Sequence, residues 1–203
     1  MNFAVFVSGN GSNLQAIIDA KKKGVIKSEL ALVFSNKRKA YALKRAEQAG
    51  IEKLFLNPKD YATPQSYERD IVIQLKDRKI DFIVCAGYMK IFTPFFIKKF
   101  KNQIINIHPS LLPAFKGASG IKDTFTYGTK LGGVTVHYVD VNMDAGPIIM
   151  QESYKIKESD TLEQIEERVH KLEHKMYPKA IALYEQGLLK IVGRKVRILD
   201  EPE

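Results

Sequence analysis

The chain has 203 residues, of which 45% are hydrophobic and 27% are charged, as is typical of one globular domain with a substantial core. Its net charge of +9 is spread over short basic clusters rather than gathered in one segment, which disfavours a nucleic-acid partner. No run approaches the roughly 18 apolar residues of a membrane helix. The first residues show no basic leader, so we expect a cytoplasmic protein with no membrane partner.

Short β-branched segments alternate with helical patterns over the first half of the chain. The expected elements are strands at residues 3–8, 30–36, 52–56, 81–87 and 103–109, and helices near 13–23, 40–50, 66–79 and 93–100. This rhythm predicts an α/β fold, an open, mostly parallel, twisted sheet with helices on both faces. The single cysteine, Cys85, falls inside the fourth strand and is interpreted as a core residue.

The pattern changes in the second half. Residues 132–140 alternate between apolar and polar, and residues 146–156 form another strand pattern after a short loop. We therefore predict antiparallel strands added to the sheet in the C-terminal part. No linker or repeat interrupts the chain, so a single domain, residues 1–203, is expected, with halves that meet near residue 100.

One long helix is expected late in the chain. The helix is predicted over Asp160–Tyr177, and Asp160 with Glu163 resembles an N-terminal cap. Its apolar stripe comprises Leu162, Ile165, Val169, Leu172 and Met176. Pro178 should break or kink this helix, because proline lacks the backbone N–H that continues the hydrogen-bond ladder.

The loop between the first strand and the first helix, SGNGSNLQ, contains two glycines. Ser12 and Gln15 fit a capping box. Glycines allow a tight turn, and the N-terminus of the following helix attracts an anion, so phosphate is the expected ligand. The loop has neither the G-K-[ST] ending of a P-loop nor the G-x-G-x-x-G pattern, which disfavours ATP and dinucleotides. A capped helix behind a turn would give the same pattern.

The stretch QIINIHPSLLP places Asn106 and His108 two residues apart at the end of an apolar strand, so that both point to the same face. An amide N–H and an imidazolium N–H that converge can stabilise an oxyanion, and histidine transfers protons near neutral pH. Asp140 and Asp144, in the loop DVNMDAGP, offer a carboxylate that would raise the pKa of the histidine. Strand-end side chains bonded to turn backbone would explain the same residues.

Five segments together resemble the folate-dependent formyltransferase family: SGNGSNLQAI, AGYMKIF, NIHPSLLP, TVHYVD and DAGPIIMQE. The first of them narrows the likeness to the glycinamide ribonucleotide branch. The resemblance implies a Rossmann-like formyltransferase fold. It also implies formyl transfer from 10-formyltetrahydrofolate to the primary amine of 5'-phosphoribosylglycinamide, in de novo purine biosynthesis and without a metal. The half before about residue 100 would bind the ribonucleotide, and the half after it would bind folate and carry the chemistry.

The resemblance implies a role for each matching residue. Asn106 and protonated His108 would stabilise the oxyanion of the tetrahedral intermediate, while Asp144 would raise the pKa of His108 and help move a proton through water. The substrate-binding set comprises Gly11, Ser12, Asn13, His170, Lys171, Leu172 and Glu173. The cofactor-binding set, around the folate, comprises Met89, Lys90, Ile91, Phe92, Asn106, Asp140, Val141, Asn142, Met143 and Asp144. The implied partners are small molecules, and the implied state is a monomer or a homodimer.

The chain departs from the family pattern at several positions. Ser119 and Ile121 stand where close relatives carry histidines, so no catalytic duty is assigned to the loop at 115–131. Pro64 stands where relatives carry a basic residue, and Lys90 stands where they often carry arginine, whose guanidinium can form two parallel hydrogen bonds. The contacts with the glutamate tail of the folate are therefore expected to differ.

Several alternatives remain open. Methionyl-tRNA formyltransferase and formyltetrahydrofolate hydrolase share this catalytic core, and we expect both to need a longer chain. The run from His170 to His174 matches the H-x-x-E-H pattern of a zinc metalloprotease, with a third ligand from Glu185, Glu201 or Glu203. A basic RNA-binding module would bind RNA in a salt-sensitive manner with no formyl transfer.

Overall fold

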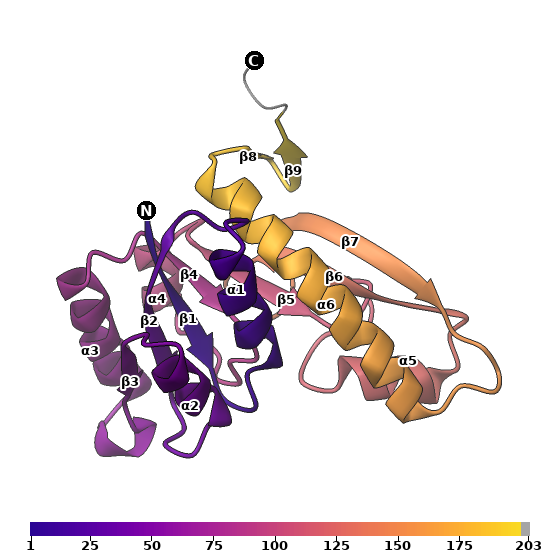
Figure 1. Ribbon diagram of the computed structural model, residues 1–203, viewed down its shortest axis with the longest axis horizontal. Coiled ribbons are helices and arrows are strands. Elements are labelled where there is room, and N and C mark those ends of the chain that lie inside the picture. Colours follow the sequence, from indigo (N-terminus) through magenta and orange to yellow (C-terminus); the bar gives the residue numbers. More distant parts are fainter. Residues whose placement is uncertain (200–203) are drawn as a thin grey trace. The chain divides into compact units, whose positions relative to one another are not determined.

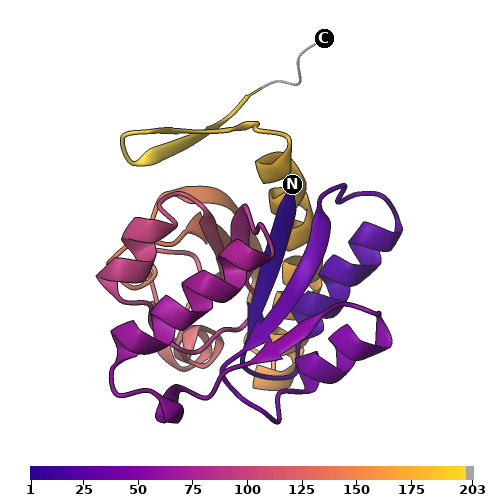
Figure 2. The ribbon, with the colours of Figure 1, turned by 90° about the vertical axis from the view of Figure 1, so that its left-hand side faces the viewer.

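The computed structural model describes residues 1–199. The chain forms two compact units, Met1–Ile105 and Asn106–Glu203. The first unit contains β1 (Asn2–Val7), α1 (Ser12–Lys22), β2 (Glu29–Ser35), α2 (Tyr41–Gln48), β3 (Lys53–Phe55), the 3-10 helix η1 (Pro58–Asp60), α3 (Pro64–Asp77), β4 (Phe82–Cys85) and α4 (Pro94–Lys99). Its strands pair in the order β3-β2-β1-β4, and every pair is parallel. α1 and α2 cover one face of these strands, and α3 and α4 cover the other (Figures 1 and 2).

β1, β2 and β4 are buried on both faces over most of their length because they are almost wholly apolar, whereas the edge strand β3 is exposed or half-buried. Aromatic rings fill much of this core. The ring centroids of Phe3 and Phe82 lie 5.1 Å apart, and those of Phe6 and Phe34 lie 4.6 Å apart. Cys85 lies in the same core, as predicted, and burial raises the pKa of its thiol.

β5 (Ile104–His108) leads from the first unit into the second. The second unit contains α5 (Gly120–Tyr127), β6 (Leu131–Tyr138), β7 (Ile148–Lys155), α6 (Leu162–Glu185), β8 (Leu189–Val192) and β9 (Lys195–Ile198). β6 and β7 are antiparallel, and β9 pairs parallel with β7 and antiparallel with β8. α6 packs against β6, β7 and α5 (Figure 1). The predicted fold class is therefore confirmed, whereas the single domain stays a prediction.

The N-terminus of α6 differs from its prediction. The capping residue is Thr161, whose hydroxyl oxygen accepts a hydrogen bond from the backbone N–H of Gln164 in a capping box. The predicted cap of Asp160 and Glu163 is therefore wrong. Asp160 instead forms an ion pair with Arg168, which lowers the pKa of its carboxyl to about 2.

Of the two outcomes predicted for Pro178, the break of α6 is wrong, whereas the kink stays a prediction. The helix runs on to Glu185, and Figure 1 shows it as one continuous coil. A proline inside a helix costs about 3 kcal/mol. Tyr177, Ala180 and Ile181 beside it are fully buried, and burying one large apolar side chain contributes about 1.5–3 kcal/mol. Tertiary packing therefore outweighs the local signal.

The start of α1 is built differently from the expected capping box. Its N-cap is Gly11, in the left-handed conformation with a φ of 79°, and no described side chain caps it. The capping role predicted for Ser12 and Gln15 is therefore wrong. Gln15 instead accepts a hydrogen bond from Arg45. The turn itself is tight, because a β-carbon on Gly11 would lie 2.6 Å from the methyl group of Ala42.

α5 and the hairpin of β8 and β9 have no counterpart among the predicted elements. α5 contains glycine, two threonines and two aromatic residues, which have low helix propensity, so the predicted loop at 115–131 is partly helical. β8 and β9 have four residues each, too few for a periodicity to stand out. Among residues 1–199, none of the helices is both long enough and apolar enough to cross a bilayer.

Replacing Gly11 with alanine should destabilise the chain more than the same change at Gly24. Both glycines have positive φ, so each substitution adds strain of about 1–2 kcal/mol. At Gly24 no described atom lies within 4 Å of the new β-carbon, whereas at Gly11 it collides with Ala42 and adds about 1–3 kcal/mol. Urea unfolding measures both variants, and equal free energies of unfolding would contradict the tight contact.

Candidate active site

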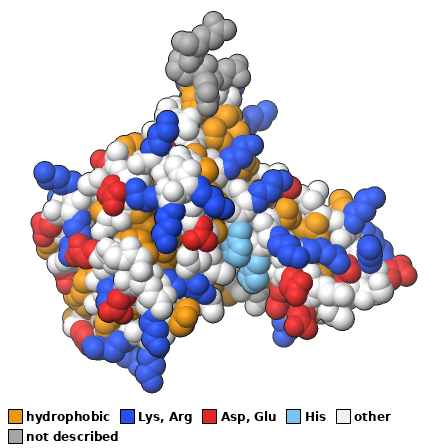
Figure 3. All heavy atoms as spheres, in the orientation of Figure 1, with side chains coloured by type: hydrophobic (Ala, Val, Ile, Leu, Met, Phe, Trp, Pro, Cys, Tyr) orange, Lys and Arg blue, Asp and Glu red, His pale blue; other side chains and the backbone are white. Residues whose placement is uncertain are grey.

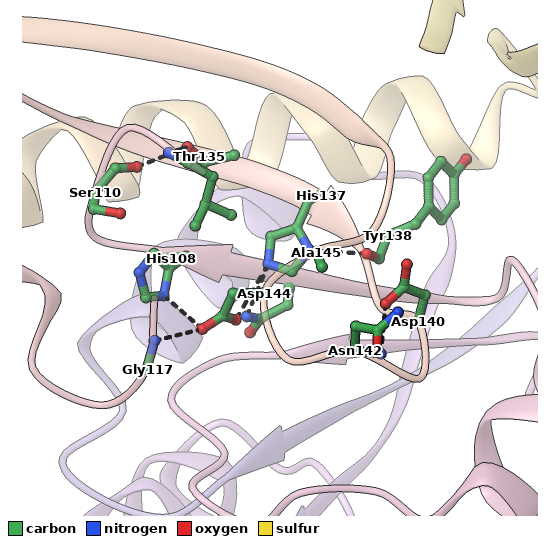
Figure 4. A network of polar contacts seen from close by, with 12 residues as sticks. His108, Ser110, Gly117, Thr135, His137, Tyr138, Asp140, Asn142, Asp144 and Ala145 are labelled. Carbon is green, nitrogen blue, oxygen red and sulfur yellow. Dashed lines mark hydrogen bonds and ion pairs between the residues drawn. The ribbon is translucent and has the colours of Figure 1, made fainter. Parts of the chain in front are cut away.

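His108, at the end of β5, is almost fully buried in a polar cluster of the second unit (Figure 4). Its Nε2 lies 2.8 Å from the carbonyl oxygen of Phe115, and its Nδ1 lies 3.5 Å from Oδ2 of Asp144. A carbonyl oxygen can only accept, so Nε2 carries a proton. Nδ1 is the other ring nitrogen, and it faces the carboxylate.

Asp144 belongs to the loop between β6 and β7, and its carboxylate is largely buried. Oδ2 accepts a hydrogen bond of 2.8 Å from the backbone N–H of Gly117. Oδ1 lies 3.7 Å from Nε2 of His137. Figure 4 shows the carboxylate between the two imidazole rings. The same carboxylate thus faces one nitrogen of each ring.

His137 joins Asn106 to this cluster, and sequence reasoning did not assign it a role. Its Nδ1 donates a hydrogen bond of 2.8 Å to the carbonyl oxygen of Tyr138, so the neutral ring has its lone pair on Nε2. The amide nitrogen of Asn106 lies 3.3 Å from that Nε2 and donates one N–H to it. The signal was present in TVHYVD, where alternation places Thr135 and His137 on one face of the strand.

The protonation state of His137 decides how the amide of Asn106 faces. Burial lowers the pKa of His137, although the carbonyl of Tyr138 and the carboxylate of Asp144 act in the opposite direction. The neutral ring accepts from the amide nitrogen. A proton on Nε2 would turn the amide oxygen toward the ring and redirect both N–H groups. Neutral His137 therefore keeps Asn106 oriented as a donor.

The loop that carries Asp144 is tightly closed. Oδ1 of Asp140 accepts a hydrogen bond of 2.8 Å from the backbone N–H of Asn142, a turn typical of aspartate. Asp144 itself has a φ of 48°, which is uncommon for a residue other than glycine. Gly146 packs so closely on the carbonyl oxygen of Tyr138 that a β-carbon would collide with it. The exposed apolar side chains of the loop are Val141 and Met143.

In the first unit, α2 holds the loop that was predicted to bind an anion. The backbone N–H of Ala42 donates to the carbonyl of Gly9 at 3.1 Å. Arg45 donates from Nε to the carbonyl oxygen of Asn10 and from Nη2 to its side-chain oxygen, both at 3.0 Å. The N-terminus of α1, with its partial positive charge, is thereby fixed in place.

The four residues from 89 to 92 differ in exposure. Met89 and Ile91 are 63% and 73% exposed, whereas Phe92 is buried in a stack of aromatic rings. The ammonium group of Lys90 lies 5.6 Å from the ring centroid of Tyr67. Within this segment, Met89 and Ile91 are therefore open to a ligand, while Phe92 anchors the backbone.

The predicted residues of α6 lie around a buried carboxylate. Glu173 is 5% exposed, and its Oε2 lies 3.0 Å from Nδ1 of His170. This hydrogen bond raises the pKa of His170. His174 stacks parallel to His170 with ring centroids 6.2 Å apart, and burial lowers its pKa. Lys171 is exposed and Leu172 is half-buried.

A profile of the formyl transferase family matches residues 1–181. The chain belongs to this family. It is 45% identical to phosphoribosylglycinamide formyltransferase of Bacillus subtilis (strain 168), over 88% of this chain and 92% of the relative. It is 43% identical to the trifunctional purine biosynthetic protein adenosine-3 of Chironomus tentans, over 92% of this chain but 14% of that protein's length.

Solved structures of formyl transferases give the same result. The crystal structure of glycinamide ribonucleotide transformylase 1 from Symbiobacterium toebii matches with a TM-score of 0.96 and 40% identity. The match covers 98% of this chain and 94% of that one. The family resemblance predicted from the five sequence segments is therefore confirmed.

The metalloprotease alternative finds no support in the part of the chain that the structure describes. No group of three or more His, Cys, Asp or Glu residues there could hold a metal ion. His170 and His174 lie on α6, Glu185 ends that helix, and Glu201 and Glu203 lie outside the described residues. The expected absence of a metal stays a prediction.

The RNA-binding alternative is disfavoured by how the charges lie. On the face drawn in Figure 3, Lys and Arg side chains are interspersed with acidic and neutral ones. An RNA-binding surface usually gathers its basic residues into one patch or stripe. The expected absence of a nucleic-acid partner is not tested by this face and stays a prediction.

His170 and His137 should titrate in a defined order. When the pH is lowered from about 8, His170 should protonate first, because Glu173 raises its pKa above 6.5. His137 should protonate after His170, because burial lowers its pKa below 6.5. Ring-nitrogen NMR shifts report both events and should show the Nδ1–H tautomer of His137 at neutral pH. A proton on Nε2 at that pH would contradict the orientation of Asn106.

Proposed function

We propose that the chain transfers a formyl group from 10-formyltetrahydrofolate to the primary amine of 5'-phosphoribosylglycinamide, a step of de novo purine biosynthesis. The proposal rests on the polar cluster in which Asn106, His137, Asp144 and His108 are joined in that order by contacts of 3.3, 3.7 and 3.5 Å. Family membership and the names of the similar proteins support the same reaction.

Two groups of the cluster suit the charge that develops in this reaction. An amine that attacks a formyl carbon leaves negative charge on the formyl oxygen. Asn106 supplies an amide N–H to that oxygen, and His108 in its protonated form supplies positive charge beside it. Phe115 fixes the ring of His108 and His137 fixes the amide, so both groups are oriented before reaction. Such preorganisation is usually a large part of catalysis.

Asp144 has two tasks in this mechanism. It stabilises the protonated ring of His108, because an opposite charge at 3.5 Å in a largely buried cluster is only weakly screened. It also helps to move a proton through water. The new bond forms between the amine nitrogen and the formyl carbon, the bond from that carbon to the folate nitrogen breaks, and the proton passes from the amine to the departing nitrogen.

The remaining predicted residues are assigned to binding. We assign the substrate phosphate to residues 11–13, because the N-terminus of a helix attracts anions. We assign the ribose to buried Glu173, with His170 beside it. The folate is assigned to residues 89–92 and 140–144, each of which exposes apolar side chains. The expected assembly is a monomer or a homodimer.

His108→Ala and Asp144→Asn should keep the fold and lose most turnover. His108→Ala removes the imidazole, and Asp144→Asn removes the negative charge that stabilises its protonated form. Loss of one group that stabilises an oxyanion typically costs roughly a hundred- to a thousandfold in rate. The assay supplies 10-formyltetrahydrofolate with and without 5'-phosphoribosylglycinamide and follows the release of tetrahydrofolate. Asp123→Asn removes an exposed carboxylate of α5 and serves as the control with unchanged turnover.

The two arms of this assay separate the related activities. Release of tetrahydrofolate only when the ribonucleotide is present supports the transferase. Release without it indicates a formyltetrahydrofolate hydrolase. Wild-type turnover in both the His108 and the Asp144 variants would refute the roles assigned to the cluster.

A further inference from the structure

A distant arginine holds the loop that presents Asp144. Arg194 lies between β8 and β9, and its Nη2 donates a hydrogen bond of 2.8 Å to the carbonyl oxygen of Ala145, 49 residues earlier in the chain. Ala145 directly follows Asp144. The turn that carries Arg194 is itself anchored, because Lys195 pairs with Ile148 where β9 joins β7.

The backbone at Asp144 needs such support. A residue other than glycine with a φ of 48° is strained, and it keeps this conformation only when its surroundings hold it. Val141 and Met143 are more than half exposed, so the first part of the loop buries little apolar surface. Gly117 holds the carboxylate of Asp144 through its N–H, and Arg194 holds the backbone immediately after it.

Arg194 contributes through its hydrogen bond rather than through packing. It borders an open hollow of about 320 Å³, lined by Gly146, Ile148, Arg194, Lys195 and Val196. The hollow opens to solvent, so loss of the side chain would let water take its place and would leave no closed cavity. A guanidinium is suited to this task because its charge strengthens the bond to the carbonyl and its planar nitrogens fix the direction.

We propose that Arg194 is a positioning residue for formyl transfer, which keeps Asp144 directed at His108 by holding the carbonyl of Ala145. Its effect on the rate rests on the proposed function, whereas its effect on the loop does not. The hairpin of β8 and β9 lies beyond residues 1–181, so the family profile does not describe this contribution.

The test compares Arg194→Met, which removes the donor, with Arg194→Lys, which keeps a charged donor. Arg197→Met removes the same charge from an exposed position of the same hairpin and is the matched control. Hydrogen exchange of the Gly117 amide reports the position of Asp144 without any substrate, because this amide donates to its carboxylate. Steady-state kinetics give kcat and KM, and thermal unfolding gives the midpoint of each variant.

Arg194→Met should speed exchange of the Gly117 amide about tenfold and lower kcat about fivefold, as expected for the loss of one exposed hydrogen bond. The unfolding midpoint should match that of Arg197→Met, and Arg194→Lys should recover part of both effects. Equal exchange at Gly117 in the Arg194→Met and Arg197→Met variants would overturn the proposal. A further outcome is faster exchange at Gly117 in Arg194→Met while even the wild-type protein shows no formyl transfer. That result would support the role of Arg194 in holding the loop and would refute the proposed function.

Discussion

Asp144 presents its carboxylate from a strained backbone with a φ of 48°, between the rings of His108 and His137. A buried carboxylate is costly unless donors surround it. The N–H of Gly117 supplies one donor, and the ring of His108 supplies another when it is protonated. The geometry of the whole cluster depends on this placement, because relaxation of the loop would withdraw the negative charge that faces both imidazole rings.

Two histidines thus face one carboxylate and yet differ in tautomer, because backbone carbonyls select different nitrogens. The carbonyl of Phe115 holds the proton on Nε2 of His108, which leaves Nδ1 to face Asp144. The carbonyl of Tyr138 holds the proton on Nδ1 of His137, which leaves a lone pair to orient an amide. In both cases the tautomer is a property of the fold rather than of the side chain.

Much of the fold could be predicted from the sequence, because strand and helix patterns depend on neighbours within a few residues. The exceptions are places where tertiary packing outweighs the local sequence signal. Pro178 stays helical because Tyr177 and Ile181 are buried on either side of it. Gly11, not Ser12, caps α1, since only a residue without a β-carbon fits against Ala42.

Local properties and long-range contacts also contribute separately at the candidate site. The amino-acid sequence is enough to show which chemical groups are available, because residue type and strand position are local properties. These groups are the amide of Asn106, the imidazole of His108 and the carboxylate of Asp144. The contacts of His137 and Arg194 emerge only in the folded chain. Their partners lie 31 and 49 residues away along the chain, and no local pattern encodes a hydrogen bond over such a separation.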